Sequence, residues 1–331
     1  MRYGIVVYKD SFNLGDDIQS YATERFLPHT DFVVDREKMD SFFTDDGKPI
    51  SVILGGWYLY NHLNWPPSPF ITPFLISMHF DTYYSCVAGE KITKNMVLED
   101  YGREWLIKNG PVGCRDLETK KLLERYGIPV FFSGCLTLTI ASFNNIPKND
   151  KIFLVDVPKS VEKYIRQKAG DICEELTHSI KMEGMPWCER RKIVEDRLKL
   201  YQGAKLVVTT RLHAALPCLA LGTPVLFLKE EWSLNRTGTW LEYLHYTSIE
   251  NLLSGQFKYD FLNPIDNKDD YKKIADRLVK NCEEFIDNQE KGNNEICLDI
   301  KMFSDGLKRT ERVKKLFNLR IDKYESELYG R

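Results

Sequence analysis

Two neighbouring residues, Arg211 and His213, have types and spacing suited to chemistry on an anion. They follow residues 204–208, a β-branched run typical of a buried parallel strand, and open residues 212–221, an Ala- and Leu-rich stretch that predicts a buried helix. Ligands of open α/β sheets bind at the carboxyl ends of strands, and a helix N-terminus there favours negative charge. A guanidinium fork binds phosphate or carboxylate, and an imidazole exchanges protons near neutral pH. These residues alone fit equally well an arginine bonded to a structural carboxylate and a histidine bonded in the core.

Two more cations repeat this placement. Arg115 comes between a predicted strand and a predicted helix, and Lys229 comes directly after another predicted strand. Asn235 follows Lys229 closely and is a further candidate for ligand binding. Several cations at strand ends suit a doubly anionic ligand, although a surface or capping pair between Arg115 and Asp116 is the alternative.

The turn after the first predicted strand carries Asn13, Gly15, Asp16 and Asp17. Gly15 allows a tight turn, and Asp16 could cap the helix that follows. Because this turn lies at the carboxyl end of a strand, its polar groups are candidates for the same cleft. A turn and a helix cap explain the pattern equally well.

Gly55 and Gly56 end the third predicted strand, where they would allow a close approach of the backbone to a ligand. A packing turn is the alternative. The loop that follows is rich in aromatic residues, which could stack on sugars or only pack against one another. These loop residues are Trp57, Tyr58, Tyr60, His62, Trp65, Pro66 and Pro67.

The elements that would position these residues alternate between short apolar runs and longer amphipathic segments, as is typical of βα units around parallel sheets. Strands are predicted at residues 4–8, 32–35, 52–54, 74–78, 111–114 and 130–132, with helices at 16–26 and 117–125. A second series has a strand at 151–157, a helix near 189–202, the strand–helix–strand unit around Arg211, and charged helices at 271–288 and 303–317. We therefore expect two successive α/β sheets facing a cleft, with a domain boundary near residue 148.

Composition and charge exclude several classes of function. The chain has 331 residues, enough for two domains, and its 46 basic and 48 acidic side chains give a net charge of −2, which does not indicate nucleic-acid binding. The eight cysteines form no Cys-x-x-Cys pair, which argues against a structural zinc site or a disulfide scaffold, and no metal-ligand spacing is visible. The first turn is not a Gly-x-Gly-x-x-Gly fingerprint of dinucleotide binding. We find neither a signal peptide nor a spanning segment and expect a cytoplasmic protein.

Four segments, in this order, resemble the polysaccharide pyruvyl transferase family. They are NLGDDIQS at residues 13–20, GCRD at 113–116, FSGCLTLT at 132–139, and the stretch from RLHA at 211–214 to LGTP at 221–224. The resemblance implies a fold similar to that of two-domain (GT-B-like) glycosyltransferases. A Rossmann-like acceptor domain would span residues 1–147, and a second one, with the donor site and the terminal helices, residues 148–331.

The resemblance also implies a reaction. The enolpyruvyl unit of phosphoenolpyruvate would be transferred, without a cofactor, onto a sugar of a surface polysaccharide or its lipid-linked precursor, giving a pyruvate ketal and phosphate. Arg115, Arg211 and His213 match family positions implicated in substrate binding or catalysis, and Lys229 is a less certain match.

The residues fit this chemistry. Phosphoenolpyruvate carries a carboxylate and a phosphate on adjacent groups, so convergent cations should bind it. Ketal formation needs an acid that protonates the methylene carbon and a base that takes a hydroxyl proton, and no metal is required. His213 is the candidate acid, and Asp16 or Asp17, on the facing domain, is the candidate base.

Two other functions stay open. A glycosyltransferase of the same fold would hold the diphosphate of a nucleotide sugar in the cationic cleft, and a non-catalytic relative would only bind carbohydrates or anions. A basic amphipathic helix near the end of the chain can lie on an anionic membrane, which would suit a lipid-linked acceptor, or can dock on the domain by its apolar stripe. Its basic residues are Lys308, Arg309, Arg312, Lys314 and Lys315.

Overall fold

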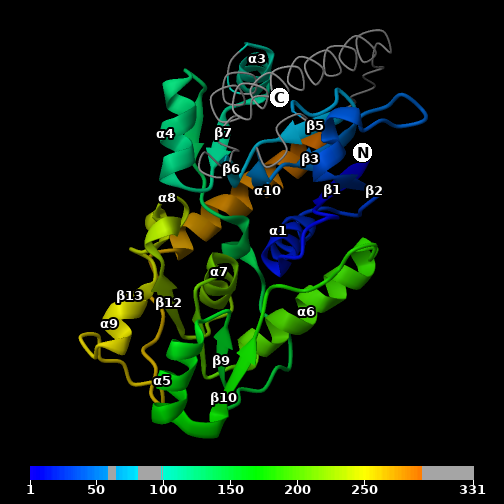
Figure 1. Cartoon of the computed structure of the whole chain (residues 1–331). Coiled ribbons are helices and arrows are strands. Elements are labelled where there is room, and N and C mark those ends of the chain that lie inside the picture. Colours follow the sequence, from blue (N-terminus) through cyan, green and yellow to red (C-terminus); the bar gives the residue numbers. More distant parts are fainter. Residues whose placement is uncertain (59–64, 81–97, 99, 293–331) are drawn as a thin grey trace, which may run out of the picture.

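The computed structural model describes residues 1–58, 65–80, 98 and 100–292 (Figure 1). The predicted helix at 303–317, the basic residues on it, and Tyr60 and His62 of the aromatic loop lie outside the described residues. Within the described part of the chain, no helix is both long and apolar enough to cross a membrane.

The N-terminal half is built on parallel strands in two hydrogen-bonded sheets. One has the order β2 (Phe32–Asp35), β1 (Tyr3–Val7), β3 (Ile50–Ile53), β5 (Ile71–Phe74), and the other β4 (Gly56–Tyr58), β6 (Met78–Phe80), β7 (Val112–Cys114), β8 (Val130–Phe132). The chain runs from β3 directly into β4 and from β5 into β6, and the Gly113 amide donates to the carbonyl of Leu75 between the two sheets. The two sheets therefore continue one another in a doubly wound order.

The helices of this half follow the strands, as βα units require. They are α1 (Leu14–Glu24), α3 (Asp100–Asn109) and α4 (Leu117–Arg125), with 3-10 helices η1 (Arg36–Ser41) and η3 (Leu136–Thr139). The predicted helix at 117–125 is confirmed.

The C-terminal half contains a five-stranded parallel sheet in the order β10 (Cys173–Leu176), β9 (Ile152–Val155), β11 (Leu206–Thr209), β12 (Val225–Lys229), β13 (His245–Ser248). Its helices are α5 (Lys159–Ala169), α6 (Trp187–Gly203), α7 (Leu212–Ala220), α8 (Leu234–Thr237) and α9 (Ile249–Leu253), with 3-10 helices η4 (Gly170–Ile172), η5 (Glu231–Ser233) and η6 (Gly238–Trp240). The strand order reverses between β9 and β11, and the crevice at such a point is where ligands of this fold bind.

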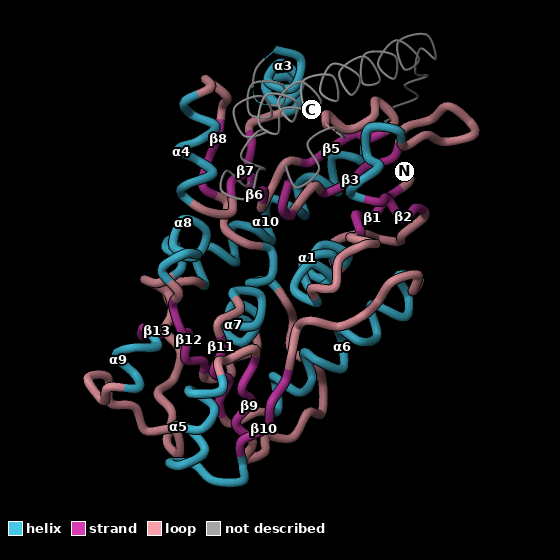
Figure 2. Tube along the Cα trace, viewed as in Figure 1, coloured by secondary structure: helices cyan, strands magenta, loops and turns pink. Residues whose placement is uncertain are grey.

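The two halves meet along α1, which contacts both α6 and α7. The loop before α1 pairs with the segment after β10: Asn13 forms an antiparallel bridge with Ser179, and the Leu14 amide donates to the His178 carbonyl at 2.8 Å. Figure 2 shows α1 and α7 between the N-terminal and C-terminal groups of strands. The predicted α/β, GT-B-like architecture of two Rossmann-like halves is thus confirmed, whereas the boundary at residue 148 stays a prediction.

Helix α10 (Lys272–Lys291) lies across the N-terminal half, although it follows the C-terminal sheet in sequence (Figure 1). Its apolar stripe includes Leu278 and Cys282, which are fully buried. Phe285 stacks on Phe74 with ring centroids 4.8 Å apart, and Ser51 Oγ donates to Gln289 Oε1 at 2.8 Å. The last described helix thus ties the two halves together.

Candidate functional site

Helices α1 and α7 begin against one another, and Gly15 makes this approach possible. A Cβ on Gly15 would lie 3.1 Å from the Cβ and 3.3 Å from the Nδ1 of His213. A larger residue would therefore press on the imidazole. Because both helices follow strands at the carboxyl edges of their sheets, two helix N-termini converge where the halves meet, and each favours an anion.

Arg115 reaches the same place from the end of β7. Its side chain is 1% exposed, and Nη1 donates to Gln19 Oε1 at 2.6 Å and lies 3.5 Å from His213 Nε2. Its Nε is buried and has no hydrogen-bond partner among the described residues; the nearest carboxylate oxygen, Asp116 Oδ2, is 4.0 Å away. A buried guanidinium with an unused donor is unfavourable unless an acceptor such as an anion binds there.

The imidazole of His213 is neutral in this arrangement. Burial, followed by the positive charge of Arg115, lowers the pKa of His213 well below its usual value of 6.5. A guanidinium can only donate, so the Nε2 that faces Arg115 accepts and Nδ1 carries the proton. The thiol of Cys135 lies 3.8 Å from the same Nε2. His213 therefore needs an added negative charge nearby to become an acid at neutral pH.

Asp16 lies one helical turn before Gln19, in the first turn of α1. Its Oδ2 accepts from Ser11 Oγ at 2.6 Å and its Oδ1 from Gln19 Nε2 at 3.4 Å. The expectation that Asp16 caps this helix is wrong: Asn13 is the N-cap, and its Oδ1 accepts from the Gly15 amide at 3.1 Å. The helix begins two residues earlier than expected because the extended backbone of Asn13 already lets its side chain take the first free amide.

Asp17 has a different environment. It is fully buried, and its two oxygens accept from Nε and Nη2 of Arg190 at 2.8 and 2.9 Å. Arg190 also donates to the carbonyls of Tyr8 and Lys9, so this ion pair fixes the turn after β1 to α6. Asp17 is thus engaged at both oxygens by a guanidinium, whereas Asp16 accepts only from the neutral groups of Ser11 and Gln19, which leaves Asp16 as the better candidate base of the two.

Arg211 occupies the N-cap position of α7, at the point where the order of the C-terminal sheet reverses. Its side chain is 40% exposed, and Nε donates to Asp156 Oδ2 at 2.7 Å. Asp156, directly after β9, also accepts from Thr177 Oγ1 and from the His178 amide. Although burial raises the pKa of Asp156, these hydrogen bonds and the charge of Arg211 lower it overall. Asp156 is therefore the structural carboxylate partner of Arg211 that the sequence left open as an alternative.

The remaining candidates are not brought into contact with His213 or Arg115 by any described hydrogen bond or ion pair. Lys229 Nζ lies 3.2 Å from Glu231 Oε1. Gly56 has φ +146°, and a Cβ there would lie 1.8 Å from Tyr8 Oη; a Cβ on Gly55 would lie 2.9 Å from Leu136 Cδ1. Both glycines therefore make room for protein side chains. Asn235 falls in α8, and its side chain is not described.

Sequence reasoning missed Gln19, Asp156 and the buried pair of His79 with Asp116. Gln19 follows Gly15 by four residues and therefore lies on the same helix face, which is a signal that the sequence carries. His79 directly follows the strand predicted at residues 74–78, so the strand-end argument applied to the arginines would have found it. Asp156 follows β9, but it lies inside the strand predicted at residues 151–157, so that argument would have missed it.

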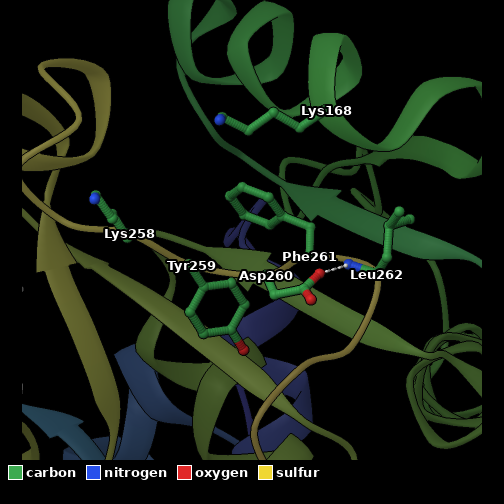
Figure 3. A pocket seen from close by; sticks show the side chains of 6 residues that line it. All are labelled: Lys168, Lys258, Tyr259, Asp260, Phe261 and Leu262. Atoms are coloured by element: carbon green, nitrogen blue, oxygen red, sulfur yellow. Dashed lines mark hydrogen bonds between the residues drawn. The ribbon is translucent and has the colours of Figure 1, made fainter.

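A separate hollow of about 470 Å³ lies beside α5 (Figure 3). None of the residues predicted for the site lines it. The lining residues are Lys168, Lys258, Tyr259, Asp260, Phe261 and Leu262. Among the described residues, no group of three or more His, Cys, Asp or Glu side chains could hold a metal ion.

The chain belongs to the polysaccharide pyruvyl transferase family, whose model matches residues 13–231. No curated protein matches it significantly. One similar solved structure is a functionally uncharacterised protein from Klebsiella pneumoniae, with 14% identity over 75% of this chain and 93% of that one and a TM-score of 0.47. Another is the UDP-GlcNAc 2-epimerase of Methanocaldococcus jannaschii in complex with UDP-GlcNAc and UDP, with 13% identity over 88% of this chain and 100% of that one and a TM-score of 0.45.

Proposed function

We propose that this protein transfers the enolpyruvyl unit of phosphoenolpyruvate onto a sugar of a surface polysaccharide or its lipid-linked precursor. Two hydroxyls of the sugar would form a pyruvate ketal, and phosphate would leave. The observation that carries this proposal is the buried Arg115, with an unused Nε, against His213 at the converging N-termini of α1 and α7. Membership in the family supports pyruvyl transfer.

The donor would bind between the two helix starts. Its carboxylate and phosphate need several donors, which Arg115 and the first amides of α1 and α7 can supply. Arg211 would contribute its two Nη groups, because within the described residues Asp156 bonds only to its Nε. Lys229, which pairs with Glu231, would add to the positive potential at the site.

His213 would act as the acid once the donor is bound. The phosphate adds full negative charge beside an imidazole whose pKa is otherwise lowered by burial and by Arg115. An anion that takes the hydrogen bonds of Arg115 would also release Nε2 from its donor. Donor binding and protonation of His213 are then coupled, so the acid would form only when there is a methylene carbon to protonate.

The acceptor would approach from the N-terminal half, where Gln19 links Asp16 to Arg115 by hydrogen bonds. We propose no cofactor, because phosphoenolpyruvate itself is the activated donor. A cytoplasmic protein, in contact with the inner face of the membrane when the acceptor is lipid-linked, would suit this reaction.

A thermal-shift experiment tests the donor. Phosphoenolpyruvate at about 100 times its dissociation constant should stabilise the fold by about 2.7 kcal/mol. Arg115→Lys is the matched variant and should need a higher donor concentration for the same shift. Stabilisation by uridine or guanosine diphosphosugars, with none from millimolar phosphoenolpyruvate, would favour a glycosyltransferase instead.

Incubation with phosphoenolpyruvate and lipid-linked saccharides tests the reaction. We expect phosphate release together with a gain in acceptor mass that corresponds to a pyruvate ketal. Donor binding without release of the donor phosphate in the presence of any acceptor would mean that the protein is a binding relative that has lost catalysis.

A further inference from the structure

Two buried arginines contact residues in the first turns of α1, and their partners differ in charge. Arg190, which is 2% exposed, donates from Nε and Nη2 to the two oxygens of Asp17 at 2.8 and 2.9 Å. Arg115, which is 1% exposed, donates from Nη1 to the side-chain amide oxygen of Gln19 at 2.6 Å. A charge that is removed from water is ordinarily paired with an opposite charge. The neutral partner of Arg115 is therefore the arrangement that needs an explanation.

The side chain of Gln19 bridges two groups of opposite charge. Its Oε1 accepts from Arg115, and its Nε2 donates to Asp16 Oδ1 at 3.4 Å and to the Gly15 carbonyl at 3.3 Å. A guanidinium can only donate and a carboxylate can only accept, so the two ends of the amide cannot be exchanged. A glutamate in this place would suit only the guanidinium, and a lysine would suit only the carboxylate. An amide is the side-chain group that serves both and adds no charge.

The amide bridge leaves the charge of Arg115 incompletely matched. Among the described residues, the nearest carboxylate oxygen is Asp116 Oδ2, which lies 4.0 Å from Arg115 Nε and only 2.6 Å from Nδ1 of His79. The imidazole of His213, 3.5 Å from Nη1, is neutral. The carboxylate of Asp16 is kept one amide away, and its other described hydrogen bond comes from a neutral hydroxyl. Each of the two bridged groups thus keeps its charge for a ligand.

We propose that Gln19 makes the site specific for an anionic donor, because it holds Arg115 in place without neutralising it. This role rests on the proposed function, in which Arg115 binds phosphoenolpyruvate and Asp16 is the candidate base. Gln19 is a positioning residue, since it acts through these two side chains. The bridge prevents a direct pair between them, which would remove the cation from the donor and the base from the acceptor hydroxyl.

Two substitutions of similar length separate charge from hydrogen bonding. Gln19→Glu keeps an oxygen acceptor for Arg115 and adds a negative charge that repels the donor, so we expect the Kd for phosphoenolpyruvate to rise about 100-fold. Gln19→Met removes the hydrogen bonds and adds no charge, so the Kd should stay within about fivefold of the wild-type value. A role limited to orienting Arg115 predicts the opposite order, with weaker binding in Gln19→Met than in Gln19→Glu.

Isothermal titration calorimetry with phosphoenolpyruvate measures the Kd, and urea unfolding shows whether each variant keeps its fold. Gln289→Glu is the matched control, because the oxygen of Gln289 also accepts one hydrogen bond, from Ser51, and joins α10 to β3. Its Kd should stay within about twofold of the wild-type value. If Gln19→Glu does not fold, Gln19→Met still decides: a Kd raised about 30-fold, as we expect for the KM of Arg115→Lys, would overturn the charge role.

The possible failures can be told apart. A wild-type Kd in Gln19→Glu would overturn the role of Gln19 and leave the proposed function in place. A wild-type protein that binds a uridine diphosphosugar instead of phosphoenolpyruvate, with the same loss of affinity in Gln19→Glu, would support the role of Gln19 and overturn the proposed function. A wild-type protein that binds neither ligand would overturn both.

Discussion

Arg115 and Arg211 hold the same position in the two halves of the molecule, between a parallel strand and the helix after it, but they have different surroundings. Arg115 is 1% exposed, and its nearest described contacts are an amide oxygen and an imidazole nitrogen. Arg211 is 40% exposed and is bonded to the carboxylate of Asp156. The difference comes from the cover: Gln19 of α1, in the same half, and His213 of α7, in the facing half, contact Arg115, whereas Arg211 stays partly exposed.

This contrast shows how burial changes what a cation can do. A charge removed from water without a carboxylate in hydrogen-bond contact stays electrostatically unsatisfied, and a bound anion then gains a strong interaction. A cation that already has a carboxylate partner and contacts water gains less from the same ligand. We therefore expect Arg115 to contribute more to donor binding than Arg211.

The largest effect on activity should come from substitution of His213, which contacts Arg115. His213→Asn keeps some hydrogen bonding but cannot donate an acidic proton, so we expect kcat to fall about 100-fold or more while donor binding survives. Steady-state kinetics measure kcat, and the thermal shift caused by phosphoenolpyruvate measures donor binding. His245→Asn, at a half-buried histidine that contacts the Asp266 carbonyl, is the control. An unchanged rate and pH profile would mean that another residue is the acid.

The next effect is that of Arg115→Lys. Lysine keeps the charge but loses the planar fork, and hydrogen bonds to charged groups contribute about 1.5–3 kcal/mol, so we expect the donor KM to rise about 30-fold. Denaturant unfolding of the variant shows whether the fold is retained. A KM effect smaller than that of Arg211→Lys would reverse the comparison.

The pH dependence of the free energy of unfolding tests the region around Arg211, where the backbone amide of His178 donates to Asp156. Burial lowers the pKa of the His178 side chain from 6.5 to about 3. Between these values the unfolded chain binds a proton that the folded protein does not, so the free energy of unfolding should fall as the pH decreases, by about 1 kcal/mol per pH unit. Urea unfolding at pH 7, 6 and 5 measures this slope, and His178→Gln should reduce it. An equal slope in the variant would mean that other groups, His213 among them, account for it.

The smallest effect should be that of Arg211→Lys, with a donor KM about fivefold higher, since Asp156 already bonds to this guanidinium and water screens it. Asp156→Asn should give a change of the same order if the pair aims Arg211 at the donor. Wild-type kinetics in both variants would mean that Arg211 and Asp156 only hold the ends of β9 and β11 together.

The sequence by itself determined the local elements. Helices α4, α6 and α7 formed close to where they were predicted. For α7 the Ala- and Leu-rich run and the strands on either side of it lie within one segment, so the signal is local. Strands β4, β10 and β13 were not predicted. Trp57 and Tyr58 of β4 were assigned to a loop. Strands β10 and β13 lie at the two edges of the C-terminal sheet, and the CEEL and HYTS sequences lack the apolar run of a strand buried on both sides.

Only the tertiary structure decided which strand ends face each other. Arg115 and His213 are 98 positions apart in the chain, and neighbouring Asp16 and Asp17 face different partners because successive helical residues point about 100° apart. Sequence patterns fix which residues reach the edge of a sheet, since that depends on neighbours in the chain. What each residue meets there depends on how the two halves pack in the core that they share around α1, and that packing is set by contacts between segments far apart in sequence.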